Sequence, residues 1–110
     1  MLTKKDLIAL NQQFSNGRIA HPSSLDFVLA QTYRSQHWFK TMCLLTRAIL
    51  VDQVFEDGNK RTAAAVIMAY LDLQEYTYNP DKIAQVVLRI AKANIINLDK
   101  IGRLIKHAIK

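Results

Sequence analysis

The residues best suited to chemistry form a polar turn directly ahead of the longest apolar run of the sequence. Gly58 can adopt backbone conformations that other residues resist, which lets the chain curl and aim its amides inward. Lys60 and Arg61 follow, and Ala63–Leu71 continues as an apolar run. A helix that starts here carries unpaired N–H groups and a positive dipole end, so it attracts phosphate. The two cations oppose that dipole, and their presence favours a bound anion.

Asp57, beside this turn, suits a metal-bound phosphate. Mg²⁺ is usually held by one or two carboxylates together with substrate phosphates. Arg61 can grip phosphate oxygens through two hydrogen bonds, and Phe55 would anchor the turn in the core. The alternative is purely structural, with Asp57 or Asn59 capping the helix while Lys60 and Arg61 point into water. Spacing alone leaves both interpretations open.

The order of residues in this turn is similar to a known motif. The stretch "VFEDGNKRTA" resembles the active-site motif of the Fic/Doc (Fido) family, written H-x-F-x-(D/E)-G-N-(G/K)-R. Lys60 and the Thr62-Ala63 that follows Arg61 resemble the Doc, or death-on-curing, branch. The stretch "SNGRIAHPSSLDFVLAQ" further resembles the family's flap and the helix after it, so the resemblance covers most of the chain.

The resemblance implies that Asp57 holds Mg²⁺ against the phosphates of ATP or another nucleotide. Gly58 and the amides after it would form the anion hole, where Asn59 and Lys60 would contact phosphate oxygens. Arg61 would bind the distal phosphate or stabilise the transferred charge. The flap would align a segment of a protein target as an added strand. Its residues are Asn16, Gly17, Arg18, Ile19, Ala20, His21 and Pro22.

The resemblance also implies a class of reaction. Family members transfer AMP, or in the Doc branch a phosphoryl group, from a nucleotide to a protein hydroxyl. Many are toxins or regulators held inactive by an inhibitory helix with an S/T-x-x-x-E-G/N pattern. Neither Glu56 nor Glu75 has Ser or Thr four residues before it. Inhibition within the chain is therefore not visible, which leaves room for an antitoxin supplied in trans.

The histidine of the family motif corresponds to Gln53 in this sequence. That histidine takes the proton from the attacking hydroxyl, and such general-base catalysis contributes ~10²–10⁴-fold. Gln cannot accept the proton, although it can orient a hydroxyl, so we expect transfer to be weak or absent. Three explanations stay open: a natural protein that binds nucleotide without transferring it, transfer by positioning and Mg²⁺ alone, or an engineered inactive variant. His21 is the histidine to test as a substitute base, whereas His37 and His107 are expected to be structural or solvated.

Helical periodicity predicts the elements that must position these residues. We expect an all-α fold, a compact bundle of about six helices, with a short flap able to form a β-hairpin between the first two. The third helix is expected over roughly 38–54. The fourth, beginning near Asn59, is apolar on nearly every side and therefore belongs at the buried centre. The expected N-caps of the first, second, fifth and sixth helices are Thr3, Ser23 or Ser24, Asn79 and Asn97.

The composition fits a single domain over residues 1–110. Half of the residues are hydrophobic, with only three Gly and two Pro, which is typical of a globular, helix-rich chain. The longest apolar run has nine residues, too few to span a bilayer. Nothing at the amino terminus resembles a signal peptide, and the single Cys43 fits a reducing compartment. We therefore expect a cytoplasmic protein with no membrane partner.

The formal charge of +6 is concentrated near the carboxyl terminus, where Lys82–Lys110 contains seven cations and one anion, Asp99. Such a region could bind nucleic acid or an acidic partner, but a solvated helix face is the simpler explanation. No aromatic residue lies among these cations, which disfavours stacking on single strands. Two alternatives to nucleotide binding stay open: a non-catalytic regulatory or toxin–antitoxin interaction module, and a basic helical nucleic-acid-binding protein.

Overall fold

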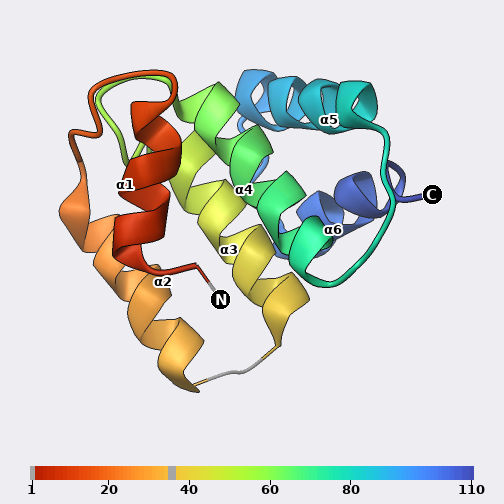
Figure 1. Cartoon of the computed structure of the whole chain (residues 1–110), viewed down its shortest axis with the longest axis horizontal. Coiled ribbons are helices and arrows are strands. Elements are labelled where there is room, and N and C mark those ends of the chain that lie inside the picture. Colours follow the sequence, from red (N-terminus) through yellow and green to blue (C-terminus); the bar gives the residue numbers. More distant parts are fainter. Residues whose placement is uncertain (1, 35–36) are drawn as a thin grey trace.

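Polar caps set where several helices begin in the computed structural model, which describes residues 2–34 and 37–110. The Thr3 hydroxyl accepts a hydrogen bond from the Asp6 amide, and the Asp6 carboxylate accepts one from the Thr3 amide. Asn79 and Asn97 accept first-turn amides in the same way, so three predicted N-caps are confirmed. The helices of the described residues are α1 Lys4–Gln12, α2 Pro22–Arg34, α3 Trp38–Leu50, α4 Asn59–Leu73, α5 Pro80–Ala93 and α6 Leu98–Lys106 (Figure 1).

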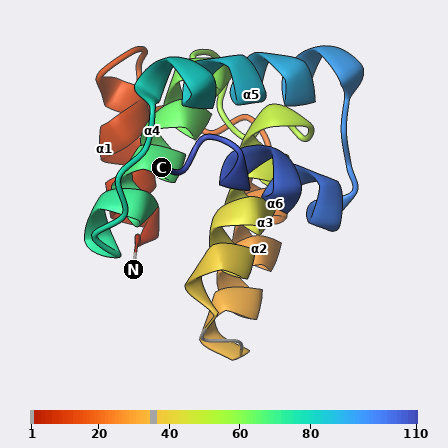
Figure 2. The ribbon, with the colours of Figure 1, turned by 90° about the vertical axis from the view of Figure 1, so that its right-hand side faces the viewer.

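The predicted all-α bundle is confirmed, with α3 and α4 together at its centre. Helix α4 packs against α1, α3 and α5, while α3 packs against α2, α4 and α6. Figure 2 shows α5 lying across one end of the bundle, with α3 and α6 side by side beneath it. The apolar face of α3 includes the fully buried Met42, Leu45 and Ile49. The sequence predicted one central helix, and the structure divides that position between two.

Two helix boundaries differ from the prediction. Helix α2 begins at Pro22, whose missing N–H costs nothing at a helix start. Ser23 and Ser24 therefore lie inside the first turn and are not N-caps; the Ser24 hydroxyl donates to the Asp52 carboxylate instead. Helix α3 ends at Leu50 and not at residue 54, so residues 51–58 form a loop that carries the first half of the motif.

The predicted flap pairs with this motif loop and forms no hairpin of its own within the described residues. Ile19 makes one antiparallel bridge with Phe55. The Ala20 and His21 amides donate to the Val54 carbonyl, at 2.7 and 3.1 Å. Pro22, placed in the flap by the resemblance, is the first residue of α2. The two segments run side by side at one end of the bundle (Figure 1), so the flap and the site loop are one structural unit.

No helix in the part of the chain that the structure describes has the length and apolar character needed to cross a membrane.

Candidate anion-binding site at the start of helix α4

The turn before α4 depends on the conformation of Gly58. Its φ of 75° and ψ of 16° lie in the left-handed region, which costs an L-residue with a side chain ~1–2 kcal/mol. A Cβ at this position would also lie 3.3 Å from the Asn11 side-chain nitrogen and 3.3 Å from the Ser15 Cβ. Glycine is therefore favoured here both by conformation and by space.

Helix α4 starts without a side-chain cap, because Gly58 occupies the N-cap position. The first amide with an intrahelical partner is that of Thr62, which donates to the Gly58 carbonyl at 2.9 Å. The amides of residues 59–61 make no hydrogen bond to any described residue. These N–H groups stand at the positive end of the helix dipole, as an anion-binding turn requires.

The Asn59 side chain closes the turn. Its oxygen accepts from the Phe55 amide at 3.1 Å, and its nitrogen donates to the Phe55 carbonyl at 2.9 Å. The Phe55 side chain is 1 % exposed, so the turn is fixed to the core at this point. With both ends of the Asn59 side chain engaged in this way, its backbone N–H is the group left to meet a phosphate.

A buried amide that the sequence analysis did not single out holds this site together. Asn11 of α1 is fully buried, and its nitrogen donates to the Asp57 carbonyl and to the Thr62 hydroxyl, each at 2.9 Å. Its oxygen accepts from the Gly17 amide, also at 2.9 Å. One side chain therefore joins α1, the flap, the motif loop and α4. The sequence signal that could have identified Asn11 is a polar residue on the apolar face of the first helix.

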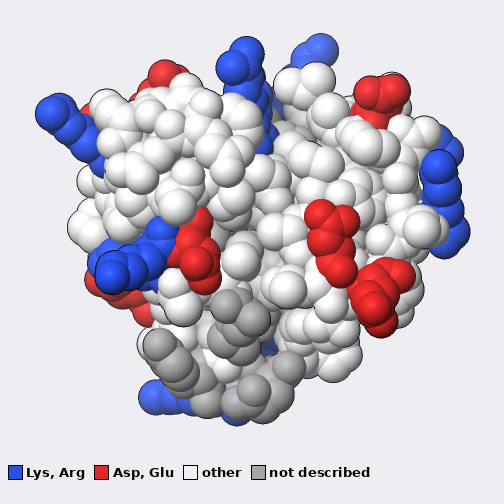
Figure 3. Space-filling model, viewed as in Figure 1, with Lys and Arg blue, Asp and Glu red and all other residues white. Residues whose placement is uncertain are grey.

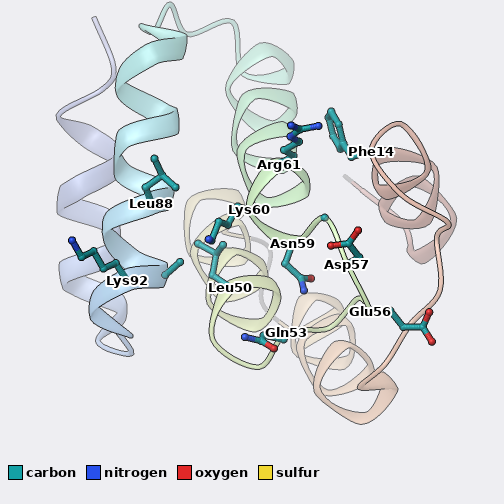
Figure 4. A pocket seen from close by; sticks show the side chains of 12 residues that line it. Phe14, Leu50, Gln53, Glu56, Asp57, Asn59, Lys60, Arg61, Leu88 and Lys92 are labelled. Carbon is teal, nitrogen blue, oxygen red and sulfur yellow. The ribbon is translucent and has the colours of Figure 1, made fainter.

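The motif residues line a pocket of about 1150 Å³. Figure 4 shows Lys60 directed toward the α5 side of the pocket and Arg61 toward the α1 side, with Asp57 on the loop between α3 and α4. Helix α5 adds Leu88 and Lys92 on the opposite wall. The predicted residues that meet here are Gln53, Asp57, Gly58, Asn59, Lys60 and Arg61. The lining that sequence reasoning missed is Phe14, Leu50, Glu56, Leu88, Ala91 and Lys92.

The flap residues do not line the pocket, and they lie behind the motif loop. The Gly17 amide donates to the Asn11 side chain, which also bonds the motif loop. The Arg18 carbonyl accepts from the Glu56 amide of that loop, at 3.0 Å. The Glu56 side chain points away from the other labelled residues in Figure 4, and its carboxylate lies 3.5 Å from the Asn16 nitrogen. The flap thus supports the site from outside.

Gln53 lines the pocket with an unusual backbone. Its φ of 52° is positive, which is uncommon for a residue with a long side chain. Its carbonyl accepts a hydrogen bond from the His21 Nδ1, at 2.9 Å. Because a carbonyl can only accept, Nδ1 must carry the proton, so neutral His21 has its Nε2 lone pair free. His21 does not itself line the pocket. His37 is the N-cap residue of α3 and His107 the C-cap residue of α6, and both are exposed.

Asp57 is compatible with a Mg²⁺ ion carried in by phosphates. Its side chain is exposed and forms no hydrogen bond or ion pair with the described residues. Within the described ranges, no group of three or more His, Cys, Asp or Glu side chains could hold a metal. A single carboxylate cannot make a closed metal site, but it can complete one when a nucleotide supplies phosphate oxygens.

No protein-family model matches this chain, and no curated protein sequence matches it. The resemblance of the turn to the Fic/Doc motif therefore rests on the order of its residues.

Proposed function

We propose that the Phe55–Arg61 turn binds a nucleotide together with Mg²⁺, as its resemblance to the Fic/Doc motif implies. The observation that carries the proposal is the left-handed Gly58 at the start of α4, followed by three residues that line a cavity and whose backbone N–H groups have no partner among the described residues. Lys60 and Arg61 add positive charge on either side, and Asp57 supplies the carboxylate. These are the components of a phosphate site in which the anion and not the protein's own side chain caps the helix.

The opposite wall of the pocket gives the rest of a nucleotide something to contact. Leu88 is 53 % exposed on α5, and Leu50 and Ala91 also line the cavity. Apolar walls with a few convergent polar groups are typical of small-molecule sites. In this arrangement the phosphates lie at the α4 start and the less polar rings of the nucleotide lie against α5.

We further propose that transfer of AMP or a phosphoryl group to a protein hydroxyl is weak or absent, because Gln53 stands where the motif has its base. The target would pair with the flap as an added strand. Gln53 can still orient a hydroxyl through its amide. The free, buried Cys43 fits work in a reducing compartment such as the cytoplasm.

Nucleotide binding is tested by titration calorimetry with ATP, GTP, CTP and UTP in the presence of MgCl₂. We expect at least one to bind, and Asp57→Ala and Arg61→Ala to weaken binding about tenfold or more, since each removes a charged phosphate or metal contact. Arg89→Ala is the control, because Arg89 lines a different hollow between α5 and α6. Absence of binding, or equal affinity in all three variants, would contradict the proposal.

The role of position 53 is tested by restoring the base. Gln53→His should raise the transfer of labelled phosphate or AMP to a target protein by about 10²-fold or more, because it supplies a general base. Gln53→Asn, which keeps a neutral amide, should leave transfer at the level of the original protein. If His and Asn variants label the target equally, position 53 does not hold the base, and His21→Ala becomes the informative variant.

The structure gives less support to the nucleic-acid alternative. The carboxyl-terminal cations do not form one stripe. Lys92 lines the pocket at the start of α4, and Lys82 and Arg89 line the hollow between α5 and α6. Arg103 and Lys106 line a further hollow between α3 and α6. On the face shown in Figure 3, the cations of the described residues are scattered among carboxylates and uncharged side chains. An interaction module without nucleotide is the remaining alternative, and it predicts binding of a protein partner with no heat signal from any nucleotide.

A further inference from the structure

A second hollow, of about 840 Å³, lies between α3 and α6. It shares no lining residue with the pocket at the start of α4. Figure 2 shows the two helices that form it side by side below α5. We call it the α3–α6 cleft; its lining residues are His37, Phe39, Lys40, Cys43, Arg47, Ile96, Asn97, Leu98, Asp99, Gly102, Arg103 and Lys106.

The rims of the α3–α6 cleft are basic on both sides. Lys40 and Arg47 belong to α3, and Arg103 and Lys106 belong to α6. The one carboxylate in the lining is Asp99, and none of the four cations forms an ion pair with a described residue. Like charges gathered around a concave surface repel one another and focus a positive potential there. The cleft therefore favours an anionic occupant.

The floor of the same cleft is apolar. Gly102 brings α6 close to the Phe39 ring, because a Cβ at Gly102 would lie 3.1 Å from a Phe39 ring carbon. Phe39 and Leu98 are half-buried in the floor, and Ile96 is 62 % exposed among the lining residues. A bare phosphate chain would gain nothing from these apolar contacts, whereas a segment with both acidic and apolar side chains would use the floor and the rims together.

The Phe39 ring is already occupied by the protein's own side chains. The Lys106 ammonium lies 5.2 Å from its centroid, in cation–π geometry. The Trp38 ring meets it edge-on, with 5.5 Å between centroids. Nucleic-acid single strands are bound by stacking bases on open aromatic faces beside cations. The Lys106 ammonium already lies over the Phe39 ring, so a base that stacked on that face would have to displace it. The chemistry of the cleft thus matches a protein segment better than a nucleic acid.

We propose that the α3–α6 cleft binds an acidic segment of a protein partner that carries apolar residues at helical spacing. Its carboxylates pair with the rim cations, and its apolar side chains contact Ile96 and Leu98. Recognition of an amphipathic helix in a groove works in this way. The proposal concerns a surface separate from the nucleotide pocket and stands whether or not a nucleotide binds there.

The probe is a fluorescein-labelled, 14-residue Glu-rich peptide with three Leu at i, i+3 and i+7, paired with a second peptide in which Gln replaces each Leu. Fluorescence anisotropy at two salt concentrations measures the affinity of the whole protein. We expect the Leu peptide to bind, more weakly at higher salt, and about tenfold more tightly than the Gln peptide, as burial of three partly exposed Leu side chains allows. Absence of binding, or equal binding of both peptides, would overturn the proposal.

Matched double variants locate the charge contribution. Arg103→Gln with Lys106→Gln should weaken the Leu peptide about tenfold, because it removes two rim charges. Lys82→Gln with Arg89→Gln removes the same charge from the hollow between α5 and α6 and should change affinity less than about twofold. Lys40→Gln, on the other rim, gives a second variant on an exposed position in case the first pair alters folding. Equal losses from both pairs would show that only net charge matters and would refute the cleft.

Two further comparisons test the floor and the class of partner. Ile96→Ser should reduce the advantage of the Leu peptide over the Gln peptide, while Leu73→Ser, at a similarly exposed residue outside the cleft, should not. A 15-nucleotide single strand and inorganic tripolyphosphate serve as competitors. If either binds more tightly than the Leu peptide and loses affinity in Arg103→Gln with Lys106→Gln, the cleft is a phosphate site and the proposal fails.

Discussion

At the scale of single residues, the site is built as much by amides as by charges. The Asn59 side chain is hydrogen-bonded to both the amide and the carbonyl of Phe55, and the Asn11 side chain donates to the Asp57 carbonyl. These two side chains fix the loop, so that the charged residues at its surface need no structural partners. Lys60, Arg61 and Asp57 are consequently exposed and available to a ligand.

Replacing Asn11 tests this support. Asn11→Ala should lower the free energy of unfolding by about 2–4 kcal/mol, because it leaves the Asp57 carbonyl, the Thr62 hydroxyl and the Gly17 amide without their partner. Urea unfolding measures the loss, and Gln13→Ala, at an exposed position on the same helix end, should cost far less. Calorimetry at low temperature, where the variant is folded, should also show weaker nucleotide binding.

The outcome separates a positioning role from simple packing. If Asn11→Ala is destabilised but binds nucleotide with unchanged affinity, Asn11 supports the fold and does not position the anion-binding turn.

At the scale of elements, the start of α4 and the segment that supports it decide the geometry. The loop after α3 is held from α1 by Asn11, from α2 by the bond between Ser24 and Asp52, and from the flap by the Ile19–Phe55 bridge. Residues 16–21 therefore stabilise the conformation of the motif loop. If a target segment paired with the outer edge of the flap as an added strand, it would therefore also contact the element that holds the motif loop in place.

Gly58→Ala tests whether the start of α4 binds the nucleotide. Its control is a variant with a similar loss of stability at another helix start. The change should destabilise the protein by about 1–2 kcal/mol, since alanine resists the left-handed conformation. Asn79→Ala should cost about 1 kcal/mol through loss of the α5 N-cap. Urea unfolding compares the two, and calorimetry should show weaker nucleotide binding in Gly58→Ala alone. Equal nucleotide affinity in both variants would rule out a role for this turn in binding.

Whether a feature could be predicted from the sequence depends on how far apart along the chain its interacting residues lie. Thr3, Asn79 and Asn97 cap helices through residues two or three positions away, so local sequence was enough. The end of α3 was predicted too late because the apolar pattern continues to Val54, which is buried in the loop and not in the helix. The role of Asn11 depends on partners up to 51 residues away, which no local pattern contains.

At the scale of the whole molecule, cations that are clustered in the sequence are separated by the fold. Lys92 of α5 reaches the pocket at the start of α4, while Arg89 on the same helix lines the hollow beside α6. Arg103 and Lys106 point instead into the α3–α6 cleft. Lys92 lies about 60° round α5 from Arg89, while Arg103 and Lys106 belong to a different helix. One basic segment therefore contributes to three surfaces. The net charge of the segment alone therefore could not indicate a partner.

The packed centre of the molecule also predicts how its stability depends on pH. Cys43 of α3 is 3 % exposed, and burial raises the pKa of its thiol from 9.0 to about 12, although nearby Lys106 acts in the opposite direction. Burial likewise raises the pKa of Tyr70 on α4 above 10.0. Both groups therefore ionise less readily in the folded protein than in the unfolded chain.

The sign of the effect follows from these pKa values. Below about pH 9 the thiol is neutral in both states, and its contribution to stability is fully present; between pH 9 and about 12 only the unfolded thiol ionises, so stability falls as pH rises. Urea unfolding at pH 8 and pH 10 should show a loss about 1 kcal/mol smaller in Cys43→Ala than in the original protein. An identical loss in both would mean that the Cys43 thiol ionises equally easily in the folded core, and hence that water reaches the space between α3 and α6.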